Sequence, residues 1–347
     1  MRKMRFAVAM LLGAALLLAG ALAAAAQSKW EVKKTVHIGG AGGWDYALVD
    51  AQTHRLFVTR TTHTDVIDTV TGKVVGDIPG QIRSHGTALV PALNRGFITD
   101  GGGSGGIIVF NLTTYKVIGR LATMPDSDGI IYDKAMNRIV AVSGDGATLM
   151  VFNPNIDPKN GQVEKIALGG KPEFLAAGDN GKVYVNLVDK SLLAVVDLRT
   201  RRVIARWPTA PGGHPTGLAL DAKTHTLFIG CRNPQKLIVM DADNGKILAA
   251  LPIGAVNDAV TLDGAQAFAS CFDGTLTVVG KEGGKYAVEQ VVRTHRGART
   301  MAVDPATNTI YMPAAEFEPA APGVPMRWPR MKPGSFMIVE VGRAAAE

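Results

Sequence analysis

The chain has 347 residues, 47% of them hydrophobic, which is ample for a large core. Its formal net charge is +7, but three of the 37 basic residues lie in the first 26, and the other 34 against 30 acidic residues leave a net of only +4. A charge excess of that size does not by itself indicate a nucleic-acid-binding protein.

The first 26 residues have the pattern of a secretory signal peptide. Arg2, Lys3 and Arg5 form a positive segment, residues 6–22 are almost wholly apolar, and a run of small residues ends at Ala26. We expect cleavage after Ala26 and an exported protein, periplasmic or secreted. A retained membrane anchor is the alternative, but the apolar stretch is short for a span. No later stretch is long enough to cross a bilayer, and we expect the mature protein to be a monomer.

Beyond this segment, an apolar run, a polar turn and a second apolar run recur along the chain. The clearest copy is PTGLALDAKTHTLFIG at 215–230, and fainter copies begin at Tyr46, Gly129 and Thr300. The central residues of the second runs, called the anchors from here on, are separated by 40, 43, 44, 44, 40 and 43 residues. The anchors are Phe57, Phe97, Val140, Tyr184, Phe228, Phe268 and Tyr311.

Each copy has the pattern of four short strands, which in the clearest copy are TGLALD, TLFIG, KLIVMD and ILAALPI. A four-stranded antiparallel unit of 40 to 44 residues, repeated seven times, is typical of an all-β, seven-bladed β-propeller. The last copy stops after its third strand, FMIVEV at 336–341, and WEVKKTVHIGG near the start has the pattern of a lone fourth strand. We therefore predict one domain over 27–343, whose N-terminal strand completes the last blade, and a tail at 344–347.

The repeats RLFVTRTTHTDVIDTVTGKVVGDIPG and TLFIGCRNPQKLIVMDADNGKILAALPIG resemble the YVTN-type repeat of exported bacterial propellers, the YncE-like family. The resemblance covers about residues 30–341, and Arg60 stands where the family often has Asn. It implies the propeller fold; some relatives are proposed to bind nucleic acid or partner proteins, and many have no known activity. The turns DTVTGKVVGD and DADNGKILAA also resemble the docking turn of pyrroloquinoline-quinone propellers, but those turns usually end in Trp and those rings usually have eight blades, so no cofactor is expected.

One face of the propeller is expected to collect polar residues around the axis. Loops that enter the first strand of a blade lie on the same face as loops that join its second and third strands, because antiparallel strands alternate in direction. Counting back from the anchors places these residues at the channel mouth: Asp45, His85, Asp128, Glu173, Thr216, Asn257 or Asp258, and Arg299. Their neighbours include Trp44, Arg83, Asp126, His214 and Arg296. We interpret the ring, with His214, as a ligand-binding site; the alternative is a wet channel whose lining holds ordered water.

A metal-assisted lactonase, lyase or hydrolase is the rival hypothesis. A divalent cation held at the axis by carboxylates, amide oxygens and imidazole would act as a Lewis acid. The leading metal candidates are Asp128, Glu173 and Asp258, with Asn257 and His85 or His214 as further donors. No catalytic residue can be assigned, because the chain has no CxxC, no HExxH and no phosphate loop in DGGGSGG at 100–106.

A Pro-rich insertion breaks the repeat in the last copy. Residues 314–334, AAEFEPAAPGVPMRWPRMKPG, lie between its second and third strands, where other copies have only a few residues. Arg327, Trp328, Arg330 and Lys332 combine aromatic surface with positive charge. We interpret this segment as an interaction loop on the face of the polar ring; a tolerated insertion is the alternative. Binding of single-stranded nucleic acid is a further alternative, weakened by the small net charge.

The two cysteines, Cys231 and Cys271, each stand three residues after an anchor, in neighbouring copies. Second strands of adjacent blades are expected on the order of 10 Å apart, whereas a disulfide needs Cα atoms within about 7 Å. We therefore predict two separate thiols.

The sequence favours a non-catalytic binding module over an enzyme. The motifs that recur are structural, and they bury apolar faces that a single hairpin could not bury alone. We expect the channel mouth and the 314–334 loop to present one face to an unidentified small molecule or macromolecule.

Overall fold

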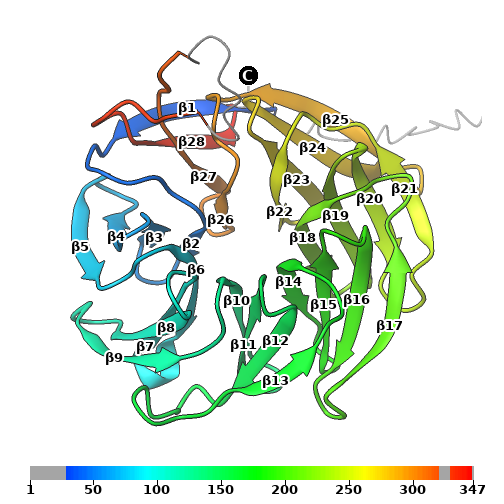
Figure 1. Ribbon diagram of the computed structural model, residues 1–347. Helices are drawn as coiled ribbons and strands as arrows, with labels where there is room; N and C mark the ends of the chain where they lie inside the picture. The colour runs from blue at the N-terminus through cyan, green and yellow to red at the C-terminus, as the bar shows by residue number, and fades with distance from the viewer. Residues whose placement is uncertain (1–28, 320–328, 346–347) are drawn as a thin grey trace, which may run out of the picture.

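The computed structural model describes residues 29–319 and 329–345, and it forms seven four-stranded antiparallel sheets around a central axis (Figure 1). The first strand of each sheet lies nearest the axis and the fourth lies at the rim. The predicted seven-bladed β-propeller is confirmed. The expected signal peptide, residues 1–26, lies outside the described residues.

The first four sheets follow the chain order without exception. The first contains β2 (Ala47–Asp50), β3 (Arg55–Thr59), β4 (His63–Asp68) and β5 (Val74–Pro79). The second contains β6 (Ser84–Val90), β7 (Arg95–Asp100), β8 (Gly106–Asn111) and β9 (Val117–Ala122), with the short 3-10 helix η1 (Pro91–Leu93) after β6. The third contains β10 (Ser127–Asp133), β11 (Arg138–Ser143), β12 (Thr148–Phe152) and β13 (Glu164–Ala167), and the fourth β14 (Pro172–Ala177), β15 (Lys182–Leu187), β16 (Leu192–Asp197) and β17 (Arg202–Pro208).

The fifth and sixth sheets repeat this order, and the seventh closes the ring. The fifth contains β18 (Pro215–Asp221), β19 (Thr226–Arg232), β20 (Gln235–Asp241) and β21 (Ile247–Leu251). The sixth contains β22 (Asn257–Asp263), β23 (Gln266–Cys271), β24 (Thr275–Glu282) and β25 (Lys285–Arg293). The seventh joins β26 (Ala302–Asp304), β27 (Thr309–Ala314) and β28 (Met337–Arg343) to β1 (Trp30–His37), so the predicted closure by the N-terminal strand is also confirmed.

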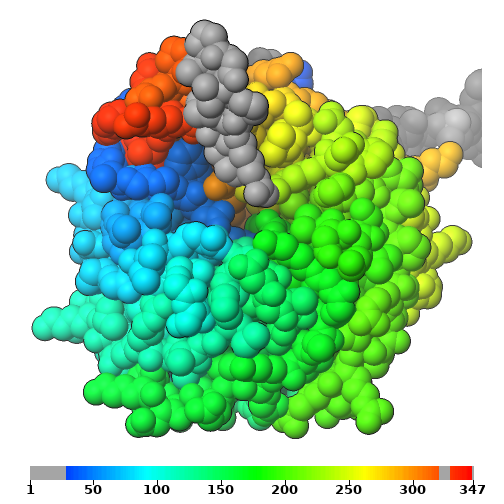
Figure 2. All heavy atoms as spheres, in the orientation of Figure 1, coloured from blue at the N-terminus to red at the C-terminus, as the bar shows by residue number. Residues whose placement is uncertain are grey.

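The core consists of seven apolar layers between neighbouring blades. All seven anchors are buried, none more than 4% exposed. Second and third strands are buried on both faces because a blade packs against each side, whereas a fourth strand such as β17 alternates exposed and half-buried residues. Side chains also fill most of the central gap that the ribbon leaves open (Figure 2).

Cys231 and Cys271 are buried and both are free, as the spacing of second strands predicts. Burial in apolar surroundings raises the pKa of each thiol to about 12, so neither is a reactive thiolate at neutral pH. In the described part of the chain, no helix has the length and apolar character needed to cross a bilayer.

Candidate functional site: a charged cup at the channel mouth

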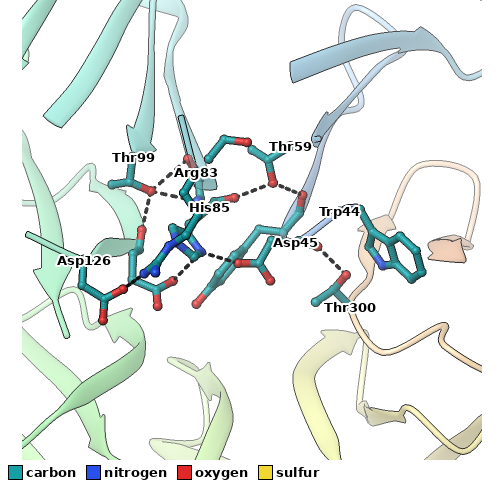
Figure 3. Close-up of polar contacts among 12 residues, drawn as sticks. Trp44, Asp45, Thr59, Arg83, His85, Thr99, Asp126 and Thr300 are labelled. Atoms are coloured by element: carbon teal, nitrogen blue, oxygen red, sulfur yellow. Dashed lines mark hydrogen bonds and ion pairs between the residues drawn. The ribbon is translucent and has the colours of Figure 1, made fainter. Parts of the chain in front are cut away.

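Hydrogen bonds between blades fix the backbone of the channel-mouth residues. Thr59 lies two residues after its anchor, and its hydroxyl donates to the carbonyl oxygen of His85 in the next blade at 2.6 Å. Thr99 occupies the same place in the second blade and donates to the carbonyl oxygen of Asp128 (Figure 3). The same kind of bond runs from Ser270 to Arg299, from Thr300 to Asp45 and from the Asn186 amide to Thr216. The rigid blades thereby position the first residues of their neighbours.

Asp45, His85 and Asp128 come together from three blades. His85 Nδ1 lies 2.6 Å from an Asp45 carboxylate oxygen and 3.6 Å from an Asp128 carboxylate oxygen (Figure 3). One donor atom from each residue lies within 4.8 Å of the others, a spacing that a metal ion could bridge. On its other side, the His85 ring accepts a hydrogen bond at Nε2 from Arg83 Nε at 3.0 Å.

These contacts set the charge of the group. Burial opposes protonation of His85, but Asp128 and Asp45 outweigh it and raise the pKa of His85 to about 9. Burial raises the pKa of Asp128 to about 6, while the pKa of Asp45 is lowered, because its bond to His85 outweighs burial. Gain of the second proton at Nε2 removes the acceptor that Arg83 Nε uses, whereas the Arg83 guanidinium still forms an ion pair with Asp126.

A second group of charges lies on the opposite side of the mouth. Asp258 accepts hydrogen bonds from Arg232 and, at 2.9 Å, from Arg299. Arg299 also donates to the Trp44 carbonyl oxygen at 2.8 Å and lies 3.6 Å from Asp45. Arg299 therefore connects Asp258 with the Asp45 side of the ring.

Two aromatic rings cross the channel one position deeper than the charged residues. Tyr46 follows Asp45, Phe174 follows Glu173, and their rings stack with centroids 4.5 Å apart. Because these residues come from the first and fourth blades, the pair spans the axis. We call this cluster of residues around the axis the channel cup. Its floor is Tyr46 and Phe174, and its wall is Asp45, His85, Asp128, Glu173, Arg232, Asp258 and Arg299.

Three residues of the expected ring lie elsewhere. His214 is exposed in the turn before β18, where its backbone has a positive φ of 50°. Asn257 is fully buried, and its amide donates to the carbonyl oxygens of Ala259 and Ser270. The Thr216 hydroxyl donates to the Asn257 carbonyl oxygen at 2.8 Å. In the sixth blade it is Asp258, not Asn257, that belongs to the cup.

The base of the insertion packs beside the cup. Phe317 and Met331 form a β-bridge, which is flanked by a hydrogen bond from the Glu318 N–H to the Arg330 carbonyl oxygen at 2.8 Å. Lys332 lies 2.8 Å from Glu316, and Arg330 lies 3.6 Å from Glu318. These two predicted cations therefore face carboxylates of the loop itself. Arg327 and Trp328 lie outside the described residues.

A cavity of about 260 Å³ lies between this base and the channel mouth. We call it the mouth pocket. Its ring of aromatic side chains includes Phe317, which lies 6.2 Å from Trp44 and 5.4 Å from Phe272 between ring centroids. The residues that line it are Gly43, Trp44, Phe272, Arg299, Phe317, Pro329 and Met331. Arg299 is shared with the cup, so the polar ring and the insertion form one continuous surface.

Sequence reasoning missed the floor of the cup and one of its cations. Tyr46 and Phe174 each directly follow a predicted ring residue. An aromatic residue at that position could have indicated a ring close to the axis. Arg232 reaches the cup from the end of a second strand, four residues after its anchor Phe228, and its sequence context carries no signal of that placement.

The His85 contacts are expected to make stability depend on pH between about 6.5 and 9. A folded-state pKa of about 9 lies above the ordinary value of 6.5, so the stabilisation is fully present below pH 6.5 and is lost as the pH rises through about 9. Denaturation at a series of pH values should show a flatter curve for His85→Gln than for wild type. The exposed His225, which lies 3.0 Å from Asp243, gives the control His225→Gln. A wild-type slope in His85→Gln would contradict this assignment.

Comparison with known proteins supports the fold assignment alone. No protein-family model matches the chain, and no curated protein sequence matches it significantly. Among solved structures, the WD40 repeats of RRP9 match at a TM-score of 0.73 and 11% identity, covering 91% of this chain and 100% of that one. The β-propeller domain of Myceliophteria thermophila Cps50 (Swd1) matches at 0.70 and 12%, with the same coverages of 91% and 100%. Kuenenia stuttgartiensis hydrazine synthase matches at 0.68 and 12%, covering 79% of this chain and 93% of that one. The chain is thus a seven-bladed β-propeller with WD40-like structural neighbours.

Proposed function

We propose that this protein is an exported, YncE-like binding module that takes a ligand at the channel mouth without chemically changing it. Propellers commonly serve as interaction modules, and the sequence carries the signal-peptide pattern and the YVTN-type repeats. The first residue of the purified mature protein tests the export part of the proposal. Gln27 is the expected first residue.

The mouth pocket is the observation that carries the proposal. Trp44 and the Pro-rich insertion are far apart in sequence, yet Phe317 and Met331 of the insertion line one cavity with Trp44 and Arg299. An apolar cavity with a few convergent polar groups is the usual form of a small-molecule site. The aromatic rings supply contact area at little cost in side-chain entropy.

Replacement of Phe317 by alanine is expected to weaken ligand binding at the mouth pocket at least about tenfold, because the central aromatic contact is lost. A fragment library screened by ligand-observed NMR against the mature protein supplies the ligands. The matched control is Ile204→Ala, which removes an exposed apolar side chain from β17 at the rim. Fragments that bind Phe317→Ala and wild type equally well would place the binding surface elsewhere and refute the proposal.

Metal-assisted hydrolysis at Asp45, His85 and Asp128 is the second candidate, favoured by the spacing of their donor atoms. A metal on His85 Nδ1 requires a proton on Nε2, which then faces the Arg83 N–H instead of an acceptor. The donor set therefore fits a metal only after Arg83 has moved. Elemental analysis of protein purified without chelator decides this candidate: a stoichiometric divalent metal that is lost in Asp128→Ala would support it.

A further inference from the structure

An arginine without an acidic partner lies beside the mouth pocket. Arg296 belongs to the loop between β25 and β26, and its guanidinium carbon is 5.5 Å from the ring centroid of Phe272 and 5.7 Å from that of Phe317. Both of these rings line the pocket. Arg296 is exposed, and its guanidinium forms no ion pair or hydrogen bond with any described residue. The pocket therefore has a cation next to it that is not matched by an anion of the described chain.

The loop that carries Arg296 is fixed against the pocket. The N–H of the next residue, Gly297, donates to the Phe272 carbonyl oxygen at 2.8 Å. Gly297 has a positive φ of 93°, and a Cβ there would lie 2.6 Å from the ring of Phe317. Glycine is the residue that allows both this conformation and this close approach. The backbone beside Arg296 thus packs directly on a ring of the pocket.

The other charges around the pocket already have partners. Glu316 and Glu318 each face a cation of the insertion itself. Arg299, which lines the pocket, donates to Asp258 at 2.9 Å. An anion that enters the pocket can therefore pair with Arg296 without breaking an ion pair of the protein.

We propose that the mouth pocket binds a small aromatic carboxylate, whose ring packs against the aromatic lining and whose carboxylate pairs with the guanidinium of Arg296. The inference rests on the proposed function, since it names a ligand class for the same pocket. The fork of an arginine matches a carboxylate through two N–H donors, and aromatic rings gain more from one another than their buried area alone provides. The volume of about 260 Å³ is below the usual range of ligand pockets, so the pocket suits a single ring.

Other ligand classes use only part of this arrangement. Aromatic faces attract organic cations, but Phe272 and Phe317 already face Arg296. Arg299 likewise lies 5.7 Å from the ring of Trp44, so a further cation would meet two positive charges. An aliphatic carboxylate pairs with Arg296 but lacks the ring contacts, and a neutral aromatic molecule has the ring contacts but leaves Arg296 without an anion. An aromatic carboxylate supplies both.

Titration with benzoate at pH 7, followed by ligand-observed NMR, tests the proposal. A carboxylic acid is ionised and arginine is protonated at this pH. Benzoate should bind the mature wild-type protein more tightly than benzamide, which lacks the charge, and benzamidine, which carries the opposite charge on the same shape. It should also bind more tightly than cyclohexanecarboxylate, which lacks the aromatic ring. Arg296→Gln should weaken benzoate binding about fivefold or more and weaken benzamide binding less.

The control variant is Arg202→Gln, which removes an exposed arginine at the start of β17 on the rim and should bind benzoate like wild type. Wild-type affinity in Arg296→Gln, or equal binding of benzoate and cyclohexanecarboxylate, would overturn the proposal. So would undetectable binding of benzoate, tighter binding of benzamidine, or binding of a single-stranded oligothymidylate in place of benzoate. If fragments still bind the mouth pocket in a Phe317-dependent way, the binding module stands and only the carboxylate assignment falls.

Discussion

Replacing Arg60 by alanine should lower the free energy of unfolding by about 3–5 kcal/mol, because it leaves a buried carboxylate without its partner. Arg60 is 1% exposed, and its Nη1 donates to Asp65 at 2.7 Å. The guanidinium also stacks over the ring of Phe336 at 3.5 Å. Its other N–H groups donate to four carbonyl oxygens of the loop before β2, those of Gly39, Ala41, Gly42 and Gly43.

Denaturant unfolding followed by circular dichroism measures this effect. Arg201→Ala removes an exposed arginine that pairs with Glu164, and it should change stability by no more than about 0.5 kcal/mol. Adding Asp65→Asn to Arg60→Ala should restore part of the loss, since the uncompensated charge is then gone. A single variant Arg60→Ala within about 1 kcal/mol of wild type would show that the loop does not depend on this side chain.

Replacing Trp30 by alanine should cost about 3–5 kcal/mol and release the strand that closes the ring. Trp30 is the one buried residue of β1. Its ring meets Phe268 edge to face at 4.9 Å, its Nε1–H donates to Gln266 at 2.9 Å, and Arg343 lies 4.2 Å above it. Without this ring, β1 keeps its pairing with β28 and the hydrogen bonds of the Trp30 backbone to Gln290, but it loses the contacts of the indole with the sixth blade.

Hydrogen exchange locates the effect of this change. In Trp30→Ala, the amides of β1 and β28 should exchange faster than those of the other six blades. Val32→Ala, which removes a 39% exposed side chain from the same strand, should leave exchange nearly unchanged. Uniform protection across all blades in Trp30→Ala would contradict the role of the indole in closing the ring.

The architecture could be predicted from the sequence because each blade repeats the same pattern of four short strands. The anchors Phe57 and Phe268 are both buried between blades, although their copies differ in most other residues. The sequence near the start has the pattern of a lone fourth strand, and the last copy lacks its fourth strand. The structure pairs the two, with Trp30 opposite Arg343 and His37 opposite Met337. Period and phase are properties of the chain itself, so no knowledge of distant contacts was needed.

The site was only partly predictable, because its members come from different blades. Counting from the anchors placed Asp45 and His85 at the channel mouth, where the structure also has them, and it left Asn257 and Asp258 as alternatives in the sixth blade. It could not tell that the positive φ of 50° at His214 turns that residue out to solvent. Nor could it tell that Asn257 points between blades while Asp258, one residue later, points into the cup; in a strand, consecutive side chains take opposite faces.

The pairing of β1 with β28 has a consequence for how the protein is made. Among the described strands, β1 is synthesised first and has no partner until β28 emerges, so its edge stays open while the intervening blades form. An open edge invites pairing with other chains. Glu31, Lys33 and Lys34 place charges along this edge. These charges oppose aggregation through β1 during synthesis, before β28 pairs with it.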